Sequence, residues 1–231
     1  MNINGFEKLS MVDYPNEIAA TIFTSGCNFR CPFCHNGPLV EHQTGTVSET
    51  EVLSYLAKRR GVITGLCVSG GEPLLQKDLE AFIKKVKAMG FKIKIDTNGT
   101  NPVALKNLID KHLIDYVAMD IKSAEDNYAQ VCGLENVNLD SIKKSIEILK
   151  AGSVDYEFRT TLIKEFHAPQ ILMGIAELIA GAKKIALQKF VYRPTCIAAQ
   201  KLHEVPREDA EIYKEFLSPY VEEVVLRGYI I

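Results

Sequence analysis

The stretch FTSGCNFRCPFCHNG, residues 23–37, decides how the rest of this chain is understood. It carries Cys27, Cys31 and Cys34 in the spacing C-x-x-x-C-x-x-C, directly after an apolar, β-branched run at 17–24. Zinc sites and iron–sulfur clusters usually take four protein ligands. Three thiolates on one short loop can hold a metal or cluster while one coordination position stays open, and open positions are typical of catalytic centres.

Outward from this loop, strand-like and helical runs alternate along the chain. The predicted strands cover 17–24, 63–69, 91–97, 116–122, 155–163 and 184–192, with a shorter one at 221–227. The predicted helices cover 48–60, 76–90, a run from Pro102, 139–152, a run from near Pro169, and 206–217. This order predicts an α/β protein with parallel strands, built from six βα units and a partial seventh. Both an open barrel and a doubly wound sheet fit the order.

Composition limits the classes of protein to be considered. The 231 residues are 47% hydrophobic and 24% charged, and the net charge of −2 gives no basic field for nucleic acid. The N-terminus lacks the pattern of a signal peptide, and no apolar run approaches the roughly 20 residues of a membrane span. The remaining cysteines, Cys67, Cys132 and Cys196, are scattered, so we expect buried thiols in a reducing cytosol.

Unusual residues follow each predicted strand. They are SGGEP at 69–73, DTNGT at 96–100, MDIK at 119–122, Arg159, and YRP at 192–194. Ligands gather at the carboxyl ends of parallel strands, so these segments predict one rim around one site. Each also has a structural explanation, such as a tight turn at the glycines or an ion pair between Arg159 and Glu157.

Asp96 and Asp120 end two consecutive strands, which we expect to be neighbours about 4.8 Å apart. Two carboxylates this close need a shared proton, a cation or a positive partner. Lys122 follows Asp120 by two residues and therefore projects from the same strand face. Thr97 could add an oxygen ligand to a hard cation.

Together these motifs resemble the radical S-adenosylmethionine (SAM) superfamily. The resemblance lies in CNFRCPFC after the first predicted strand, with Phe33 before its last cysteine, and in GGE after the second strand. It implies a partial (β/α)6-type open barrel as a single domain over 1–231, with a lead-in at 1–16 and a C-terminal extension at 206–231. It also implies that three cysteines bind three irons of a [4Fe-4S] cluster and that SAM holds the fourth.

The resemblance implies roles for individual residues. Cys27, Cys31 and Cys34 would be the cluster ligands. The expected SAM contacts are Phe33 and His35 at the adenine, Gly70, Gly71 and Glu72 at the methionyl amino group, Lys122 and Arg159 at the carboxylate and ribose hydroxyls, and also Asn98, Tyr192 and Arg193. Related activating enzymes place a monovalent cation beside SAM, which here would involve Asp96, Thr97 and Asp120.

Within the superfamily, the segment GFEKLSMVDYPNEIAATIFTSGCNFRCPFCHNGPLV is similar to the activating enzymes of glycyl-radical proteins. It looks most like the anaerobic ribonucleoside-triphosphate reductase activating group. This implies a glycyl-radical enzyme as protein substrate and a flavodoxin- or ferredoxin-type electron donor. Two departures are Asn16, where the group commonly has glycine, and the absence of a cysteine-rich insert between Cys34 and Gly70.

Two alternatives remain at this stage. One is a radical SAM enzyme that acts on a small molecule or on another protein. The other is a non-catalytic metal-binding module, in which His35 or a distant cysteine completes a zinc site.

Overall fold

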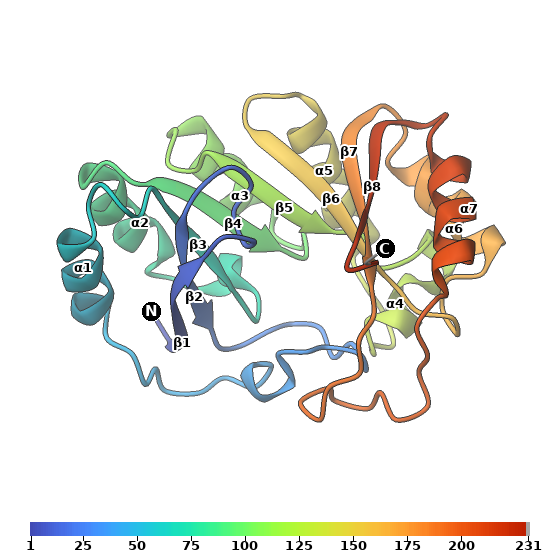
Figure 1. The fold of residues 1–231 in the computed structure, drawn as a ribbon, viewed down its shortest axis with the longest axis horizontal. Helices are drawn as coiled ribbons and strands as arrows, with labels where there is room; N and C mark the ends of the chain where they lie inside the picture. The colour runs from blue at the N-terminus through green and yellow to red at the C-terminus, as the bar shows by residue number, and fades with distance from the viewer. Residues whose placement is uncertain (230–231) are drawn as a thin grey trace.

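The computed structural model describes residues 1–229 and contains one eight-stranded sheet in sequential order (Figure 1). The strands are β1 (Ile3–Ser10), β2 (Ala19–Thr24), β3 (Gly65–Gly70), β4 (Lys92–Thr97), β5 (Tyr116–Asp120), β6 (Asp155–Leu162), β7 (Ala182–Lys189) and β8 (Val221–Arg227). β1 is antiparallel to β2, and every later neighbour pair is parallel. Among the described residues β8 does not pair back with β1, so the sheet is an open barrel, as predicted.

Helices connect the strands and lie along the outer side of the arc in Figure 1. The α-helices are α1 (Glu49–Lys58), α2 (Leu79–Ala88), α3 (Pro102–Asp110), α4 (Tyr128–Val131), α5 (Leu139–Lys150), α6 (Pro169–Leu178) and α7 (Arg207–Leu217). Short 3-10 turns are η1 (Gly37–Leu39), η2 (Pro73–Leu75) and η3 (Glu125–Asn127). The β2–β8 part therefore contains the expected six βα units and a partial seventh.

Local sequence signals account for several of these boundaries. Ser48 caps α1 by accepting a hydrogen bond from the backbone N–H of Glu51 at 3.1 Å. Pro102 and Pro169 occupy the first turns of α3 and α6, where a missing N–H costs nothing. None of the helices in residues 1–229 is long and apolar enough to cross a membrane.

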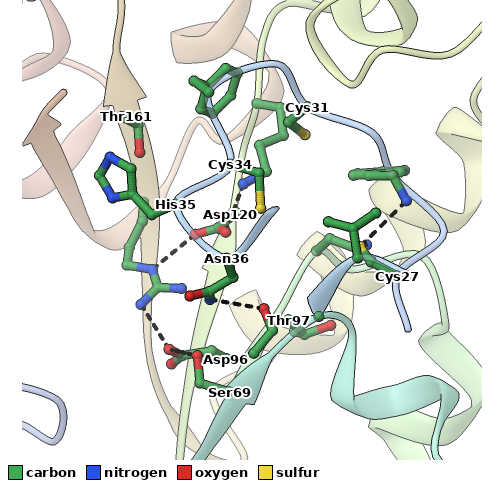
Figure 2. Close-up of a pocket in the computed structure, with 18 of the residues that line it drawn as sticks. Cys27, Cys31, Cys34, His35, Asn36, Ser69, Asp96, Thr97, Asp120 and Thr161 are labelled. Carbon is green, nitrogen blue, oxygen red and sulfur yellow. Dashed lines mark hydrogen bonds and ion pairs between the residues drawn. The ribbon is translucent and has the colours of Figure 1, made fainter. Parts of the chain in front are cut away.

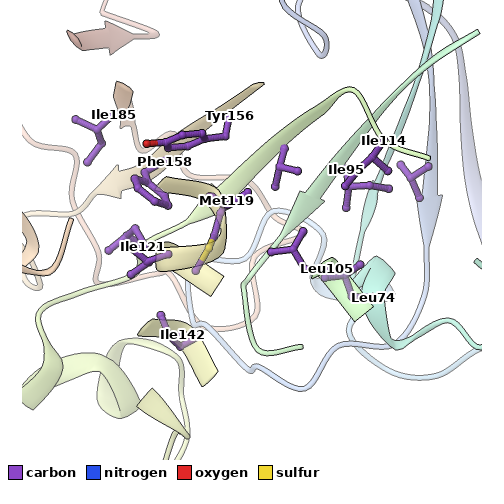
Figure 3. Packing of buried hydrophobic residues seen from close by; sticks show 14 of the residues in the cluster. Leu74, Ile95, Leu105, Ile114, Met119, Ile121, Ile142, Tyr156, Phe158 and Ile185 are labelled. Atoms are coloured by element: carbon purple, nitrogen blue, oxygen red, sulfur yellow. The ribbon is translucent and has the colours of Figure 1, made fainter. Parts of the chain in front are cut away.

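Strand alternation separates an apolar outer layer from a polar barrel interior. Ile95 of β4, Met119 of β5 and Phe158 of β6 are fully buried in the layer that also contains Leu105 of α3 (Figure 3). Their strand neighbours point to the opposite face, since successive side chains alternate. The interior face consequently receives charged residues such as Asp96 and Arg159.

The parallel register brings the strand ends to one edge. Thr24 pairs with Gly70, Thr97 with Met119, Asp120 with Arg159, and Thr161 with Gln188. The motifs predicted at the rim are therefore neighbours in space.

The structure differs from the predicted elements in the N-terminal segment and at the end of β7. The lead-in at 1–16 contains strand β1, which the sequence did not reveal because its residues are mostly half-exposed and not strictly alternating. β7 ends at Lys189, so 190–192, predicted as strand, belongs to the following loop.

Asn16 has a φ of 64°. This left-handed conformation suits glycine or asparagine, so the departure at this position changes only a turn.

Candidate active site

A cavity of about 290 Å³ opens at the carboxyl ends of the strands (Figure 2). It is bordered by the cysteine loop on one side and by polar strand ends on the other. Its lining includes most of the residues predicted for the site, namely Cys27, Cys31, Phe33, Cys34, His35, Gly70, Gly71, Asp96, Thr97, Asn98, Asp120, Lys122 and Arg159. Glu72, Tyr192 and Arg193 do not line it.

The three loop cysteines line this cavity as free thiols. Burial raises the pKa of Cys27 to about 12 and also raises that of Cys34. A hydrogen bond from the Cys132 thiol lowers the pKa of Cys31, in spite of its burial. Among residues 1–229, no three His, Cys, Asp or Glu side chains are close enough together to form a ready-made metal centre. Because metal ligation deprotonates thiols, any metal or cluster bound by these three side chains would release protons and would require the sulfurs to move closer together.

Contacts with distant segments hold the cysteine loop in place. Asn36 Nδ2 donates to the carbonyl oxygen of Gly70 at 3.0 Å, and His35 Nε2 lies 2.7 Å from the carbonyl oxygen of Val191. The His35 ring also stacks on Phe190 with 6.0 Å between the ring centroids. The loop is therefore fixed to the ends of β3 and β7.

The segment after β7, residues 190–206, also packs on the cysteine loop. The backbone N–H of Ala198 donates to the carbonyl oxygen of Pro32 at 2.9 Å. A Cβ on Gly37 would collide with the carbonyl oxygen of Thr195. Glycine at this position allows the two segments to approach closely.

The two glycines of SGGEP allow close packing between backbone segments, while their predicted contact with a ligand stays a prediction. Gly70 has a φ of 110°, and a Cβ there would collide with the Thr24 backbone. A Cβ on Gly71 would meet the carbonyl oxygen of Gly26. The glycines therefore let the end of β3 lie against the end of β2, which forms the floor of the cavity.

Glu72 is buried beneath this floor, with 1% of its surface exposed. Its carboxylate accepts hydrogen bonds from the backbone N–H of Leu74 at 3.0 Å, the Thr97 hydroxyl at 2.8 Å and the backbone N–H of Asn98 at 2.6 Å. Burial raises its pKa to about 7. In this structure Glu72 joins the β3 and β4 loops and does not reach the cavity.

The acid pair is bridged by Arg159. Its Nη1 lies 3.2 Å from Asp96 Oδ2, and its Nε lies 2.9 Å from Asp120 Oδ1. Lys122 Nζ donates to the other oxygen of Asp120 at 2.8 Å. The sequence left open whether a shared proton, a cation or a positive side chain compensates the two carboxylates. In the structure positive side chains do so. Glu157, the alternative partner for Arg159, instead pairs with Arg227 through two contacts of 2.9 Å.

These ion pairs determine the charge states. Burial alone would favour neutral carboxyls, but Arg159 and Lys94 outweigh it and hold the pKa of Asp96 well below its usual range. Arg159 and Lys122 likewise outweigh burial and lower the pKa of Asp120. The Asp120 carboxylate in turn raises the pKa of Lys122 in spite of its burial. All of these groups are therefore charged near neutral pH.

The remaining predicted contacts are placed as follows. Phe33 is buried, and the ammonium of Lys122 lies 5.8 Å from its ring centroid. Asn98 Nδ2 donates to Asn28 Oδ1 at 2.8 Å and thereby joins the β4 loop to the cysteine loop. Tyr192 and Arg193 are exposed in the loop that replaces the predicted end of β7.

Several lining residues were not predicted as ligand contacts, although Ser69 belongs to the predicted rim segment SGGEP. Ser69, Thr161 and Gln188 lie on strand ends beside Asp96 and Arg159, and Asn36 lies in the cysteine loop. Thr161 could have been found, because it follows Arg159 by two residues and so shares its strand face.

The sequence gave no indication that His167 has a structural role. It is buried, with Nδ1 accepting from the backbone N–H of Ile163 at 3.0 Å and Nε2 lying 3.1 Å from the carbonyl oxygen of Lys122.

Comparison with known proteins identifies the family. The sequence profile of the radical SAM superfamily matches residues 21–167, which hold the cysteine loop and the strand ends through β6. The chain belongs to the radical SAM superfamily. Its members use a [4Fe-4S] cluster and SAM, so this protein is a radical SAM enzyme and not a zinc-binding module.

Named relatives of this radical SAM enzyme match between 64% and 97% of its length. A Methanocaldococcus jannaschii protein, provisionally named a glycyl-radical enzyme activating enzyme, is 35% identical over 97% of this chain and 95% of its own. The pyruvate formate-lyase-activating enzyme of Staphylococcus epidermidis is 30% identical over 64% of each chain. The solved structure of Streptococcus suis SuiB bound to S-adenosylmethionine covers 89% of this chain and 49% of that chain, with a TM-score of 0.65 and 14% identity. This last similarity concerns the fold.

The residues present fit the cofactors of the family. Three thiols on one loop provide an incomplete ligand set for a cluster. Across the same cavity, the guanidinium of Arg159 and the ammonium of Lys122 provide cationic donors for a carboxylate.

Proposed function

We propose that this protein is an activating enzyme of a glycyl-radical enzyme. Its proposed substrate is a glycine Cα–H of a partner protein, and the proposed partner is an anaerobic ribonucleoside-triphosphate reductase. The observation that supports this most is a cavity with three thiols on one side and a row of charged groups on the other, in a chain that aligns over 97% of its length with a provisionally named activating enzyme.

In this proposal Cys27, Cys31 and Cys34 hold three irons of the cluster. When bound, the reduced cluster supplies the electron that cleaves SAM into methionine and a 5′-deoxyadenosyl radical. Arg159 and Lys122 bind the SAM carboxylate and ribose hydroxyls through charge-assisted hydrogen bonds.

The chain also supplies apolar shielding and backbone donors. Phe29, Phe33 and Val40 are buried side chains in the cavity wall, and they exclude water from the reacting atoms. The backbone at Gly70 and Gly71 borders the cavity and is proposed to meet the methionyl amino group. Glu72 is proposed to act there indirectly, by holding this floor against the β4 loop.

Other features stay predictions. They include the flavodoxin- or ferredoxin-type electron donor, the cytoplasmic location, and SAM contacts from His35, Asn98, Tyr192 and Arg193. A monovalent cation at Asp96, Thr97 and Asp120 also stays a prediction, and the positive partners around both acids favour compensation of their charge by the protein itself.

The test is radical transfer under anaerobic conditions. The reduced, cluster-loaded enzyme is mixed with SAM and a candidate glycyl-radical protein, and the product is examined by electron paramagnetic resonance. We expect slow, uncoupled SAM cleavage by the enzyme alone and a stable backbone radical when the correct partner is present.

Two controls make the assay specific. Replacing the partner's glycine by alanine should abolish the signal while the two proteins still bind, and Cys31→Ala in the enzyme should abolish it as well. A signal that survives the glycine replacement, or efficient turnover of a free small molecule without a protein partner, would favour the small-molecule class of radical SAM enzyme.

A further inference from the structure

Lys94 is a buried ammonium that the predicted SAM contacts do not explain. It lies on β4, two residues before Asp96, and its side chain is 3% exposed. Its Nζ donates to Asp96 Oδ1 and lies 3.7 Å from Cys67 Sγ. A buried ammonium is costly unless a carboxylate compensates its charge. Lys94 and Asp96 therefore form one electrostatic unit.

Both oxygens of Asp96 are occupied by donors from the protein. Oδ1 accepts from Lys94, while Oδ2 accepts from the Ser69 hydroxyl at 2.9 Å and faces Arg159 Nη1 at 3.2 Å. Lys94 approaches Asp96 from the side away from the cysteine loop. On that side Lys94, Asp96 and Arg159 border a second cavity of about 300 Å³ inside the barrel. Asp96 is thus compensated from two sides.

Each carboxylate oxygen of Asp120 likewise accepts a hydrogen bond from a cationic side chain. Its Oδ1 accepts from Arg159 Nε at 2.9 Å, and its Oδ2 accepts from Lys122 Nζ at 2.8 Å. An added cation between the two carboxylates would compete with these donors for the same oxygens and would lie close to Arg159. Like charges at such distances repel strongly in a poorly solvated site.

The charges form a row with a simple balance. Each neighbour in the sequence Lys94, Asp96, Arg159, Asp120, Lys122 forms an ion pair with the next, so the row holds three cations and two carboxylates. The row therefore has one excess positive charge, which can compensate the carboxylate of one bound ligand. Without Lys94 the row would have no net charge. The positive charge of Arg159 would then be needed to compensate Asp96 and Asp120, and none would remain for a ligand.

We propose that Lys94 is a positioning residue that acts as a built-in cation. It neutralises Asp96 from the interior side, so that Arg159 keeps its positive charge for the carboxylate of SAM and no monovalent cation from solution is required. The inference rests on the use of SAM by the family and not on the identity of the partner protein, so SAM binding tests it separately from glycyl-radical formation.

The experiment measures SAM affinity of the cluster-loaded enzyme in different salts. Tetramethylammonium chloride, whose cation is too large for the site, is replaced by lithium, sodium or potassium chloride at constant ionic strength. For the native enzyme the dissociation constant should change by less than about twofold, because ionic screening is the same in each buffer.

The Lys94→Met variant should respond differently. In tetramethylammonium chloride its SAM affinity should fall by about tenfold, which corresponds to one lost charge-assisted interaction. A small cation should restore most of this affinity by occupying the position that the ammonium leaves open beside Asp96. A merely structural lysine would give no such salt-specific rescue.

The matched control is Lys92→Met, two residues earlier on the same strand. Lys92 is largely exposed and pairs with Glu17, away from the cavity, so its removal should leave both affinity and salt response unchanged. Should Lys94→Met not fold, the native salt series still decides. A native enzyme that requires one particular small cation overturns the proposal, as does a Lys94→Met variant with native affinity or with a loss that no cation restores.

Discussion

Arg159 of β6 and Asp120 of β5 are register partners, and their side chains also meet, with 2.9 Å between Nε and Oδ1. The two residues are 39 positions apart in the sequence. Their contact holds the guanidinium at the edge of the cavity, where it can face a ligand. The same pair joins β5 to β6 and positions the group that we propose binds the SAM carboxylate.

The first prediction concerns Arg159. Arg159→Met should weaken SAM binding by about 1.5–3 kcal/mol, because it removes a charge-assisted hydrogen bond. Iron content should remain normal, since the cysteines are unaffected. The measurement is SAM affinity of the reconstituted enzyme, with Arg59→Met as control, because Arg59 packs over the Tyr55 ring away from the cavity. Native affinity in Arg159→Met would remove this residue from the SAM site.

The second prediction concerns the cluster. Anaerobic enzyme should hold about four irons per chain, and Cys27→Ala, Cys31→Ala or Cys34→Ala should each abolish SAM cleavage. Cys67→Ala, Cys132→Ala and Cys196→Ala should retain the cluster with modest losses of stability, because these buried thiols lie outside the cysteine loop. Iron and sulfide analysis together with the visible spectrum provides the measurement. Full activity in a loop variant would show that the ligand assignment is wrong.

The third prediction concerns pH and His167. Burial lowers its pKa to about 4, whereas the unfolded chain binds a proton near the ordinary value of 6.5. The unfolded state therefore binds more protons between these values, so the contribution of His167 to stability is present above pH 6.5 and is lost as pH falls toward 4. Between pH 7.5 and pH 5 the loss should be about 2 kcal/mol.

His167→Gln should remove this part of the pH dependence. Its amide can still donate to the carbonyl oxygen of Lys122, which the Nε2–H of the neutral histidine contacts in the native protein. The measurement is the free energy of unfolding in denaturant at both pH values. His203→Gln is the control, because His203 is 70% exposed and pairs with Glu165 at the surface. Equal slopes for His167→Gln and the native protein would contradict the assignment.

The fourth prediction concerns the contact between the cysteine loop and residues 190–206. Gly37→Ala should lower the free energy of unfolding by about 1–3 kcal/mol, because the added methyl group collides with the Thr195 carbonyl oxygen. Limited proteolysis should then cut within 190–206 more quickly. Thr195→Ala, which keeps the carbonyl group, should behave like the native protein. Unchanged proteolysis in Gly37→Ala would mean that the two segments do not depend on this contact.

The sequence by itself determined the order of strands β2 to β8 and the end of those strands at which the site lies. Apolar periodicity, the Ser48 cap and the prolines at 102 and 169 are local signals, and they act between residues a few positions apart. The cysteine spacing is equally local. Because parallel strands present their carboxyl ends at one edge, the motifs that follow them had to meet there.

The tertiary structure alone decided how those residues are used. Glu72 is turned beneath the cavity floor, Arg159 bridges both acids, and Lys94 completes the charge row from the interior. Strand β1 and the packing of His35 against a carbonyl group 156 residues away were equally hidden. Such contacts depend on strand register and on side chains from distant segments that compensate each other's charge. No local pattern encodes them, because their energy arises only when the sheet has brought the groups together.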